Sequence, residues 1–143
     1  MKHKTITPDM IISKAREYLG VPWVHQGRDK TKGVDCSGFV INIYEELTGE
    51  KLSWLPKDYA RVVDGPMMRA WCDFCLDRVP GKKYQPGDIL LLRIRREPQH
   101  LAVVTDYGII HAHQGVGKVV ETRLDERWRK RIVEVYRFRE VSK

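Results

Sequence analysis

The apolar residues of this chain are spaced in two different ways, and this change constrains the fold more than any other feature of the sequence. In the first half they recur every three or four residues, as on a helix that buries one face. In the second half, from the turn at Pro86-Gly87 onward, short apolar runs alternate with turn residues, as in β-strands. Helices followed by an antiparallel sheet predict an α+β fold.

Three helices are expected in the first half. Their ranges are residues 8–20, a segment from 35 or 36 to about 48, and residues from about 66 to 79. Thr7 is suited to cap the first helix, and Pro8 suits its first position. The buried stripe of that helix is predicted to contain Ile11, Ala15, Tyr18 and Leu19. The polar, glycine-rich stretch 21–33 is predicted to be a loop.

About five strands are expected in the second half, over residues 88–92, 100–105, 109–113, 119–123 and 132–138. Asp106-Tyr107-Gly108 is a hairpin signal between the second and third of these strands. Asp88 is expected to stabilise the preceding turn, and a basic helical turn around Trp128 is expected before the last strand. With 143 residues and neither a repeat nor a linker, the chain is predicted to be a single domain over residues 1–143.

The chain is basic, with a formal net charge of +7. Two groups of basic residues contribute, namely Arg93, Arg95 and Arg96, then Arg127, Arg129, Lys130 and Arg131. Such a surface attracts polyanions, but no zinc-finger spacing or RNP-like motif accompanies it, so no specific nucleic acid is predicted. An anionic bacterial envelope would be attracted equally well, and a solvated basic face without a ligand is the plain alternative.

The N-terminal stretch and the cysteines bear on location and cofactors. Residues 1–8 are basic, but no apolar run follows, so we predict synthesis in the cytoplasm without a signal peptide, and no membrane span. Three cysteines fit no disulfide framework. Cys72 and Cys75 form a C-x-x-C without a second pair for zinc, so a buried core position is expected for at least one, and no metal is predicted.

Cys36 is a candidate nucleophile. Asp35 is a favoured N-cap residue and would place Cys36 in the first turn of a helix. There the helix dipole lowers the pKa of a thiol, and free N–H groups can receive an oxyanion. Gly38 is a poor helix former, so we expect substrate to approach closely there. From Cys36 alone, a buried structural cysteine is the more common alternative.

Histidines in the second half supply candidates for the base that a cysteine nucleophile needs. His100 opens a predicted strand, and His111 and His113 share one face of the next. An antiparallel pairing can bring either of the latter beside His100. The pattern therefore predicts a Cys-His-His site and leaves the third member open.

The order of these motifs resembles NlpC-type bacterial cell-wall cysteine peptidases over about residues 10–138. The landmarks are Gly20-Val21-Pro22-Trp23, Asp35-Cys36-Ser37-Gly38, Pro86-Gly87-Asp88, His100 at the start of an apolar strand, and Ile110-His111-Ala112. The C-terminal part, from Ile110 to Arg131, is most similar to the branch found in bacteriophage tail and gene-transfer-agent clusters.

The resemblance implies a papain-like fold and hydrolysis of the γ-D-glutamyl bond to a diamino acid in peptidoglycan stem peptides. It implies Cys36 as nucleophile, His100 as base and then acid, and His111 as the residue that orients His100, with His113 as the rival. Neither a metal nor an organic cofactor is implied. The partners would be peptidoglycan or a small peptide and, in the phage setting, tail proteins of a virion that acts at the cell wall.

One landmark departs from the family pattern. The family usually has tyrosine where this chain has Trp23, whose indole donates a hydrogen bond but accepts none. We expect Trp23 to line the substrate pocket, or to be a packing aromatic, and we count Asp35, Ser37 and His113 as further candidates for substrate binding. The departure leaves open a papain-like amidase or acyltransferase with another substrate, and a structural tail-assembly subunit is a third alternative.

Overall fold

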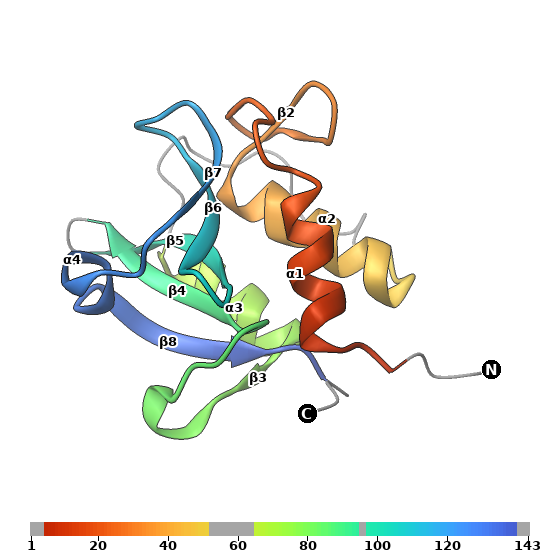
Figure 1. Cartoon of the computed structure of the whole chain (residues 1–143). Helices are drawn as coiled ribbons and strands as arrows, with labels where there is room; N and C mark the ends of the chain where they lie inside the picture. The colour runs from red at the N-terminus through yellow and green to blue at the C-terminus, as the bar shows by residue number, and fades with distance from the viewer. Residues whose placement is uncertain (1–4, 52–64, 95–96, 140–143) are drawn as a thin grey trace.

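The computed structural model describes residues 5–51, 65–94 and 97–139. Its helices are α1 (Pro8–Arg16), α2 (Cys36–Thr48), α3 (Gly65–Cys75) and α4 (Glu126–Arg129). Its strands are β1 (Arg28–Asp29), β2 (Gly33–Val34), β3 (Asp77–Arg78), β4 (Ile89–Ile94), β5 (Glu97–Val104), β6 (Ile109–His113), β7 (Lys118–Thr122) and β8 (Ile132–Arg137). Figure 1 shows α1 and α2 side by side next to the sheet, with α4 at the opposite end.

The main sheet has six strands in the order β3-β8-β4-β5-β6-β7, and every neighbouring pair is antiparallel. The predicted α+β class is confirmed. The sequence predicted about five strands because β3 consists of two exposed residues and has no apolar signal. The hairpin of β5 and β6 forms as predicted, with Val103 opposite Ile110 and Val104 opposite Ile109.

Two helices are shorter than predicted. α1 ends at Arg16, and the chain turns before Gly20, which has φ = 88°. Leu19 is 43% exposed, so its assignment to the buried stripe was wrong. α3 ends at Cys75, four residues before the predicted end at Val79, because the chain enters β3 and the backbone N–H of Val79 bonds to β8 instead (2.8 Å to the carbonyl of Val135).

The stretch predicted as a loop contains a small antiparallel pair, β1 and β2. It is also attached to the main sheet, because the N–H of Trp23 donates to the carbonyl of Gly117 at 2.8 Å and Pro22 bridges to Lys118 at the start of β7. The loop therefore has a fixed position between α2 and β7.

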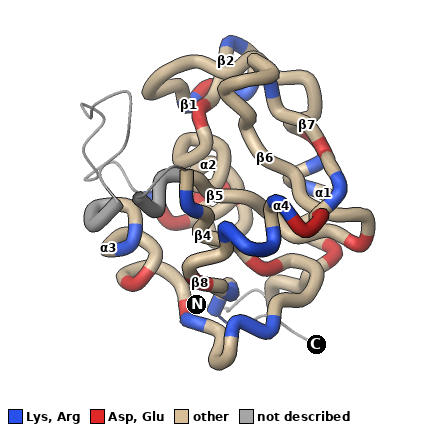
Figure 2. Tube along the Cα trace, turned by 90° about the vertical axis from the view of Figure 1, so that its left-hand side faces the viewer, with Lys and Arg blue, Asp and Glu red and all other residues tan. Residues whose placement is uncertain are grey.

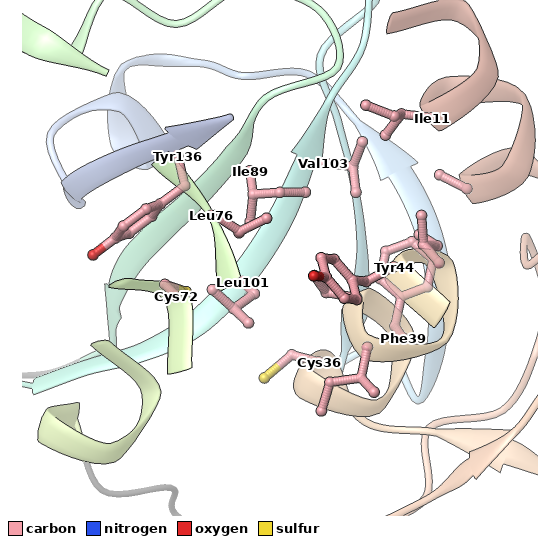
Figure 3. Close-up of a cluster of buried hydrophobic side chains, with 14 of the residues drawn as sticks. Ile11, Cys36, Phe39, Tyr44, Cys72, Leu76, Ile89, Leu101, Val103 and Tyr136 are labelled. Atoms are coloured by element: carbon pink, nitrogen blue, oxygen red, sulfur yellow. The ribbon is translucent and has the colours of Figure 1, made fainter. Parts of the chain in front are cut away.

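The sheet separates two apolar clusters. The larger joins α1, α2 and α3 to one face of the sheet, and its strand residues include Ile89, Leu91, Leu101, Val103, Ile110, Ala112 and Tyr136. Figure 3 shows part of this cluster, with Cys36 on α2, Cys72 on α3 and Leu101 from β5. The smaller covers the other face and includes Leu90, Leu92, Ala102, Val104, Ile109 and Val135, with Trp128 packed against it. None of the three cysteines, all of which lie in the described ranges, forms a disulfide. Cys72 and Cys75 are both buried in the larger cluster, which confirms the prediction of a core position for at least one of them.

Asp88 stabilises the turn before β4, as predicted. Its Oδ2 accepts from the N–H of Gln85 at 2.9 Å, and Arg137 on β8 donates to both carboxylate oxygens at 2.8 and 2.9 Å. In the described residues, no helix combines the length and the apolar character needed to cross a membrane. The basic residues Arg95 and Arg96 lie outside the described ranges.

Candidate active site

Asp35 fixes the start of α2. It is the N-cap, and its Oδ1 accepts from the N–H of Gly38 at 2.7 Å while its Oδ2 accepts from the N–H of Gln26 at 2.9 Å. The side chain of Ser37 also donates to Oδ1, at 3.3 Å. Asp35 is only 3% exposed, and both oxygens bond to backbone, which favours a role in positioning Cys36 over the predicted contact with substrate.

Position 38 requires glycine for a different reason from the one expected. The carbonyl oxygen of Gly27 lies so close to its Cα that a side-chain methyl group would collide with it. The close approach at Gly38 therefore comes from the protein's own loop and not, as predicted, from substrate. The same carbonyl accepts from the N–H of Asp35 at 3.3 Å.

Cys36 is the first residue of α2 and is 8% exposed. α2 packs against β5 and β6, and the backbone N–H of Leu101 lies beside the sulfur, where it stabilises the thiolate. The sulfur is therefore placed at the peptide that joins His100 and Leu101. The N–H groups of Cys36 and Ser37 lie near the sulfur as well.

The acidity of Cys36 differs from the prediction. Burial, and then the nearby charge of Asp35, raise the pKa of its thiol to about 12 even though the surrounding N–H groups lower it. A helix N-terminus stabilises a thiolate by about 1 kcal/mol, which lowers its pKa by less than about one unit. Burial can raise the pKa of a thiol by about 3 units or more. The expectation of a lowered thiol pKa is therefore wrong, because a thiol with so high a pKa is neutral at physiological pH.

A chain of hydrogen bonds joins side chains from three neighbouring strands. The Nε2 atom of His100 on β5 lies 2.7 Å from Nδ1 of His111 on β6. The Nε2 atom of His111 lies 3.2 Å from the hydroxyl oxygen of Thr122 on β7. His113 is farther from His100, with ring centroids 6.5 Å apart against 5.0 Å for His111, and its Nδ1 accepts from the N–H of Val116 at 3.3 Å. This geometry supports His111 over His113 as the partner of His100.

Trp128 covers the three imidazole rings from α4. Its ring centroid lies 5.1 Å from that of His111, 6.0 Å from that of His100 and 5.9 Å from that of His113. Asp125 caps this short helix by accepting from the N–H of Trp128 at 3.1 Å, and the guanidinium of Arg131 lies 5.6 Å from the Trp128 ring centroid. Sequence reasoning recognised the basic helical turn but did not place its tryptophan at the site.

The buried histidines are neutral. Burial, and then the repulsion that positive charge on His111 or His113 would exert, hold the pKa of His100 well below its usual value. Burial lowers the pKa of His111 to about 3, with a smaller contribution from His113. Each of these two rings therefore carries one N–H and one lone pair at neutral pH.

Trp23 lies near the start of α2, because it forms a β-bridge with Val34, two residues before Cys36. It is partly buried against the larger cluster, and its ring stacks on that of His25 with centroids 6.4 Å apart. Contacts of Trp23, Ser37 and His113 with substrate stay predictions. Among the described residues, no group of three or more His, Cys, Asp or Glu side chains has the arrangement to hold a metal ion.

The sequence profile of the NlpC/P60 family matches residues 20–137. This chain belongs to the NlpC/P60 family. It is similar to the gamma-DL-glutamyl hydrolase of Bacillus subtilis (strain 168), with 22% identity over 90% of this chain, and it spans 29% of the length of that relative. The match covers every landmark from the loop at Gly20 to the last strand.

Solved structures share the fold. The NlpC/p60 domain of the peptidoglycan hydrolase SagA is 25% identical, with a TM-score of 0.60 over 83% of this chain and 91% of that domain. An NlpC/P60 family protein from Bacillus cereus ATCC 10987 is 23% identical, with a TM-score of 0.71 over 96% of this chain and 42% of the other. The papain-like fold predicted from the motif order is confirmed.

Proposed function

We propose that this NlpC/P60 domain is a cysteine hydrolase that cleaves an amide bond in peptidoglycan stem peptides, between γ-D-glutamate and a diamino acid. The observation that carries the proposal is the 2.7 Å hydrogen bond between His100 and His111. His100 lies on β5, and the backbone of this strand lies beside the Cys36 sulfur. The names of the similar proteins, a gamma-DL-glutamyl hydrolase and a peptidoglycan hydrolase, point to the same substrate class.

The roles follow from which ring nitrogen is free. The Nε2 atom of His100 is engaged by His111, which leaves Nδ1 as the atom that accepts the thiol proton. As the sulfur attacks the amide carbonyl carbon, the S–H proton passes to Nδ1 and a tetrahedral intermediate forms. The C–N bond then breaks, and His100 returns the proton to the departing amine. The product of this half-reaction is a thioester on Cys36.

Water completes the cycle. His100 removes a proton from water, the resulting hydroxide adds to the thioester carbonyl, and the C–S bond breaks to release the acid and regenerate the thiol. The N–H groups of Cys36 and Ser37 lie near the sulfur at the start of α2, and they would stabilise the oxyanion in both steps.

Both groups are neutral before substrate binds, because burial raises the pKa of the thiol and lowers that of the imidazole. The proton therefore moves during the attack and not beforehand, so His100 acts as a general base. A preformed thiolate–imidazolium pair is not required.

The surface charge suits an anionic polymer. Figure 2 shows lysines and arginines gathered at α4, the helix that carries Trp128 over the histidines. The residues concerned are Arg127, Arg129, Lys130 and Arg131. Positive charge beside the site would raise the local concentration of an anionic cell wall. The resemblance to phage-tail members adds the proposal of a virion setting, which co-purification of the chain with tail particles would test.

The test compares the wild type with Cys36→Ala and with Cys72→Ala, a control that removes a second buried cysteine. The substrates are muropeptides of defined sequence and a γ-D-glutamyl dipeptide, and the readout is release of the new amine. Cys36→Ala should lower the rate at least about 1,000-fold, as loss of a nucleophile does in other hydrolases, while the control keeps the rate of the wild type. Equal release by Cys36→Ala and the wild type would exclude the thiol mechanism.

The same reaction can be followed by mass spectrometry. A wild-type acyl-enzyme whose mass increase equals the γ-D-glutamyl fragment would support the proposed bond. An adduct from another amide or ester, with no reaction on muropeptides, would instead indicate an amidase or acyltransferase with a different substrate.

A further inference from the structure

The hydrogen-bond chain of the site continues past His111 to Thr122. We propose that Thr122 is a positioning residue that fixes the tautomer of His111 and thereby keeps Nδ1 of His100 unprotonated and ready to act as a base. The inference rests on the proposed function, because it concerns how His100 is prepared for that reaction. Thr122 lies on β7, two strands away from His100, and touches His100 only through His111.

The position of the single proton on His111 sets the direction of every hydrogen bond in the chain. Its ring is fully buried, and both of its nitrogens lie within hydrogen-bond distance of a partner. A neutral imidazole has one N–H, so one nitrogen donates and the other accepts. If Nε2 donates to the hydroxyl oxygen of Thr122, then Nδ1 accepts from Nε2–H of His100. If the hydroxyl donates instead, every donor and acceptor in the chain is reversed.

The reaction distinguishes these two arrangements. When His100 takes the thiol proton, both of its nitrogens carry hydrogen. Nδ1 of His111 must then be an acceptor, because two N–H groups facing each other at 2.7 Å would repel. The proton of His111 is therefore on Nε2, and the hydroxyl oxygen of Thr122 is its acceptor. In the reversed arrangement, Nδ1 of His100 would already be protonated and could not accept the proton of Cys36.

In the hydrogen bond between His111 and Thr122, the histidine ring is shielded from water. His111 has no exposed surface, and Trp128 packs edge-on against it with ring centroids 5.1 Å apart and an interplanar angle of 85°. A polar contact that is shielded from water is stronger, and its loss is less easily compensated by solvent. Thr122 therefore biases the tautomer of a ring that solvent reaches poorly.

The test is a pair of substitutions with a matched control. Thr122→Val removes the hydroxyl and keeps the branched shape, whereas Thr122→Ser keeps the hydroxyl. Thr105→Val is the control, because its hydroxyl bonds to Glu121 and to a turn and not to a histidine. We expect Thr122→Val to lower kcat about 10- to 100-fold with KM unchanged, and Thr122→Ser to stay within about 3-fold of the wild type.

A second readout does not depend on activity. In ¹⁵N-histidine NMR spectra, the wild type and Thr122→Ser should show His111 as the Nε2–H tautomer, and Thr122→Val should show a mixture or the other tautomer. If Thr122→Val does not fold, Thr122→Ala takes its place. An unchanged tautomer in the variant that lacks the hydroxyl would overturn the proposal, even if kcat fell. If the wild type hydrolyses no muropeptide, the proposed function fails while the spectra still decide the role of Thr122.

Discussion

The two halves of the site are held by different kinds of interaction. At the Cys36 half, a carboxylate binds backbone N–H groups, and the carbonyl of Gly27 lies against Gly38. At the histidine half, side chains from three strands bond to one another under the ring of Trp128. The first half is thus encoded mainly in two short segments of sequence, and the second depends on how strands far apart in the sequence align.

The halves also share an electrostatic feature. Burial favours the neutral form of both groups, so it raises the pKa of the Cys36 thiol and lowers that of the His100 imidazole. The same physical cause acts in opposite directions because a thiol is neutral when protonated and an imidazole is neutral when deprotonated. The two shifts together keep the proton on sulfur until substrate binds.

Among substitutions of the residues that hold the two halves in place, the nucleophile itself aside, the largest effect is expected at the centre of the histidine half. His111→Ala removes the hydrogen-bond partner of His100 and should lower kcat about 100- to 1,000-fold, within the range that a positioned base contributes. His113→Ala should lower it less than about 5-fold, because its Nδ1 bonds to the N–H of Val116. Steady-state kinetics on a γ-D-glutamyl dipeptide would measure both effects.

His111→Asn is the informative companion, since an amide oxygen can accept the hydrogen bond from His100. It should recover part of the activity that His111→Ala loses. A larger loss for His113→Ala than for His111→Ala would assign the orienting role to His113 and contradict the 2.7 Å contact as the functional one.

A smaller effect, on stability, is expected from breaking the Cys36 half. Asp35→Ala removes two backbone hydrogen bonds to a charged acceptor, one of them buried and one part-buried, and should lower the free energy of unfolding by about 3 kcal/mol. Thr7→Ala is the matched control, because Thr7 caps α1 far from the site in sequence, and its loss should cost about 1 kcal/mol. Urea denaturation would measure both changes.

Kinetic measurements on Asp35→Ala and Thr7→Ala also distinguish a loss of positioning at the site from a general loss of stability. Asp35→Ala should lower kcat at a temperature where the variant is still folded, because the start of α2 and the loop at Gln26 lose their common anchor. Thr7→Ala should leave kcat unchanged. Equal kinetic effects of the two substitutions would show that Asp35 acts only through general stability.

The sequence predicted the local structure of the Cys36 half well because its signals are local. An N-cap residue, a helix start and a glycine stand next to one another, and a papain-like motif order surrounds them. The reason for Gly38 was wrong, however, because the approach of Gly27 across the loop is not a local property. The thiol pKa was wrong for a related reason, since it depends on burial that a linear motif does not contain.

The histidine half was predicted only in part. Alternation along the strands placed His111 and His113 on one face, but the contact that distinguishes them depends on ring orientation across the pair of strands. Thr122 had no signal of its own, because it is one polar residue in an alternating strand. Trp128 was absent from the predicted site because a short basic helix has no period that reveals which side chain turns inward.

The smallest expected effect is a dependence of stability on pH that differs between the halves. For His100 and His111, the folded protein holds the pKa below that of the unfolded chain, which is about 6.5. As the pH falls below about 6.5, the unfolded chain binds protons that the folded protein does not. The free energy of unfolding should therefore fall, by at most about 1.4 kcal/mol per pH unit for each histidine.

The Cys36 half should act at the other end of the pH scale. The pKa of the Cys36 thiol is about 12 in the folded protein, which is above that of a thiol in the unfolded chain. The contribution of this thiol to the free energy of unfolding is therefore complete below about pH 8.5 and is lost as the pH rises towards 12. Denaturation between about pH 5 and 7 avoids the titration of most carboxylates, and there His111→Asn should show a shallower slope than the wild type while Cys36→Ser should not. Equal slopes for the wild type and His111→Asn would mean that His111 is not held neutral by burial, which would also remove the basis for a fixed tautomer at Thr122.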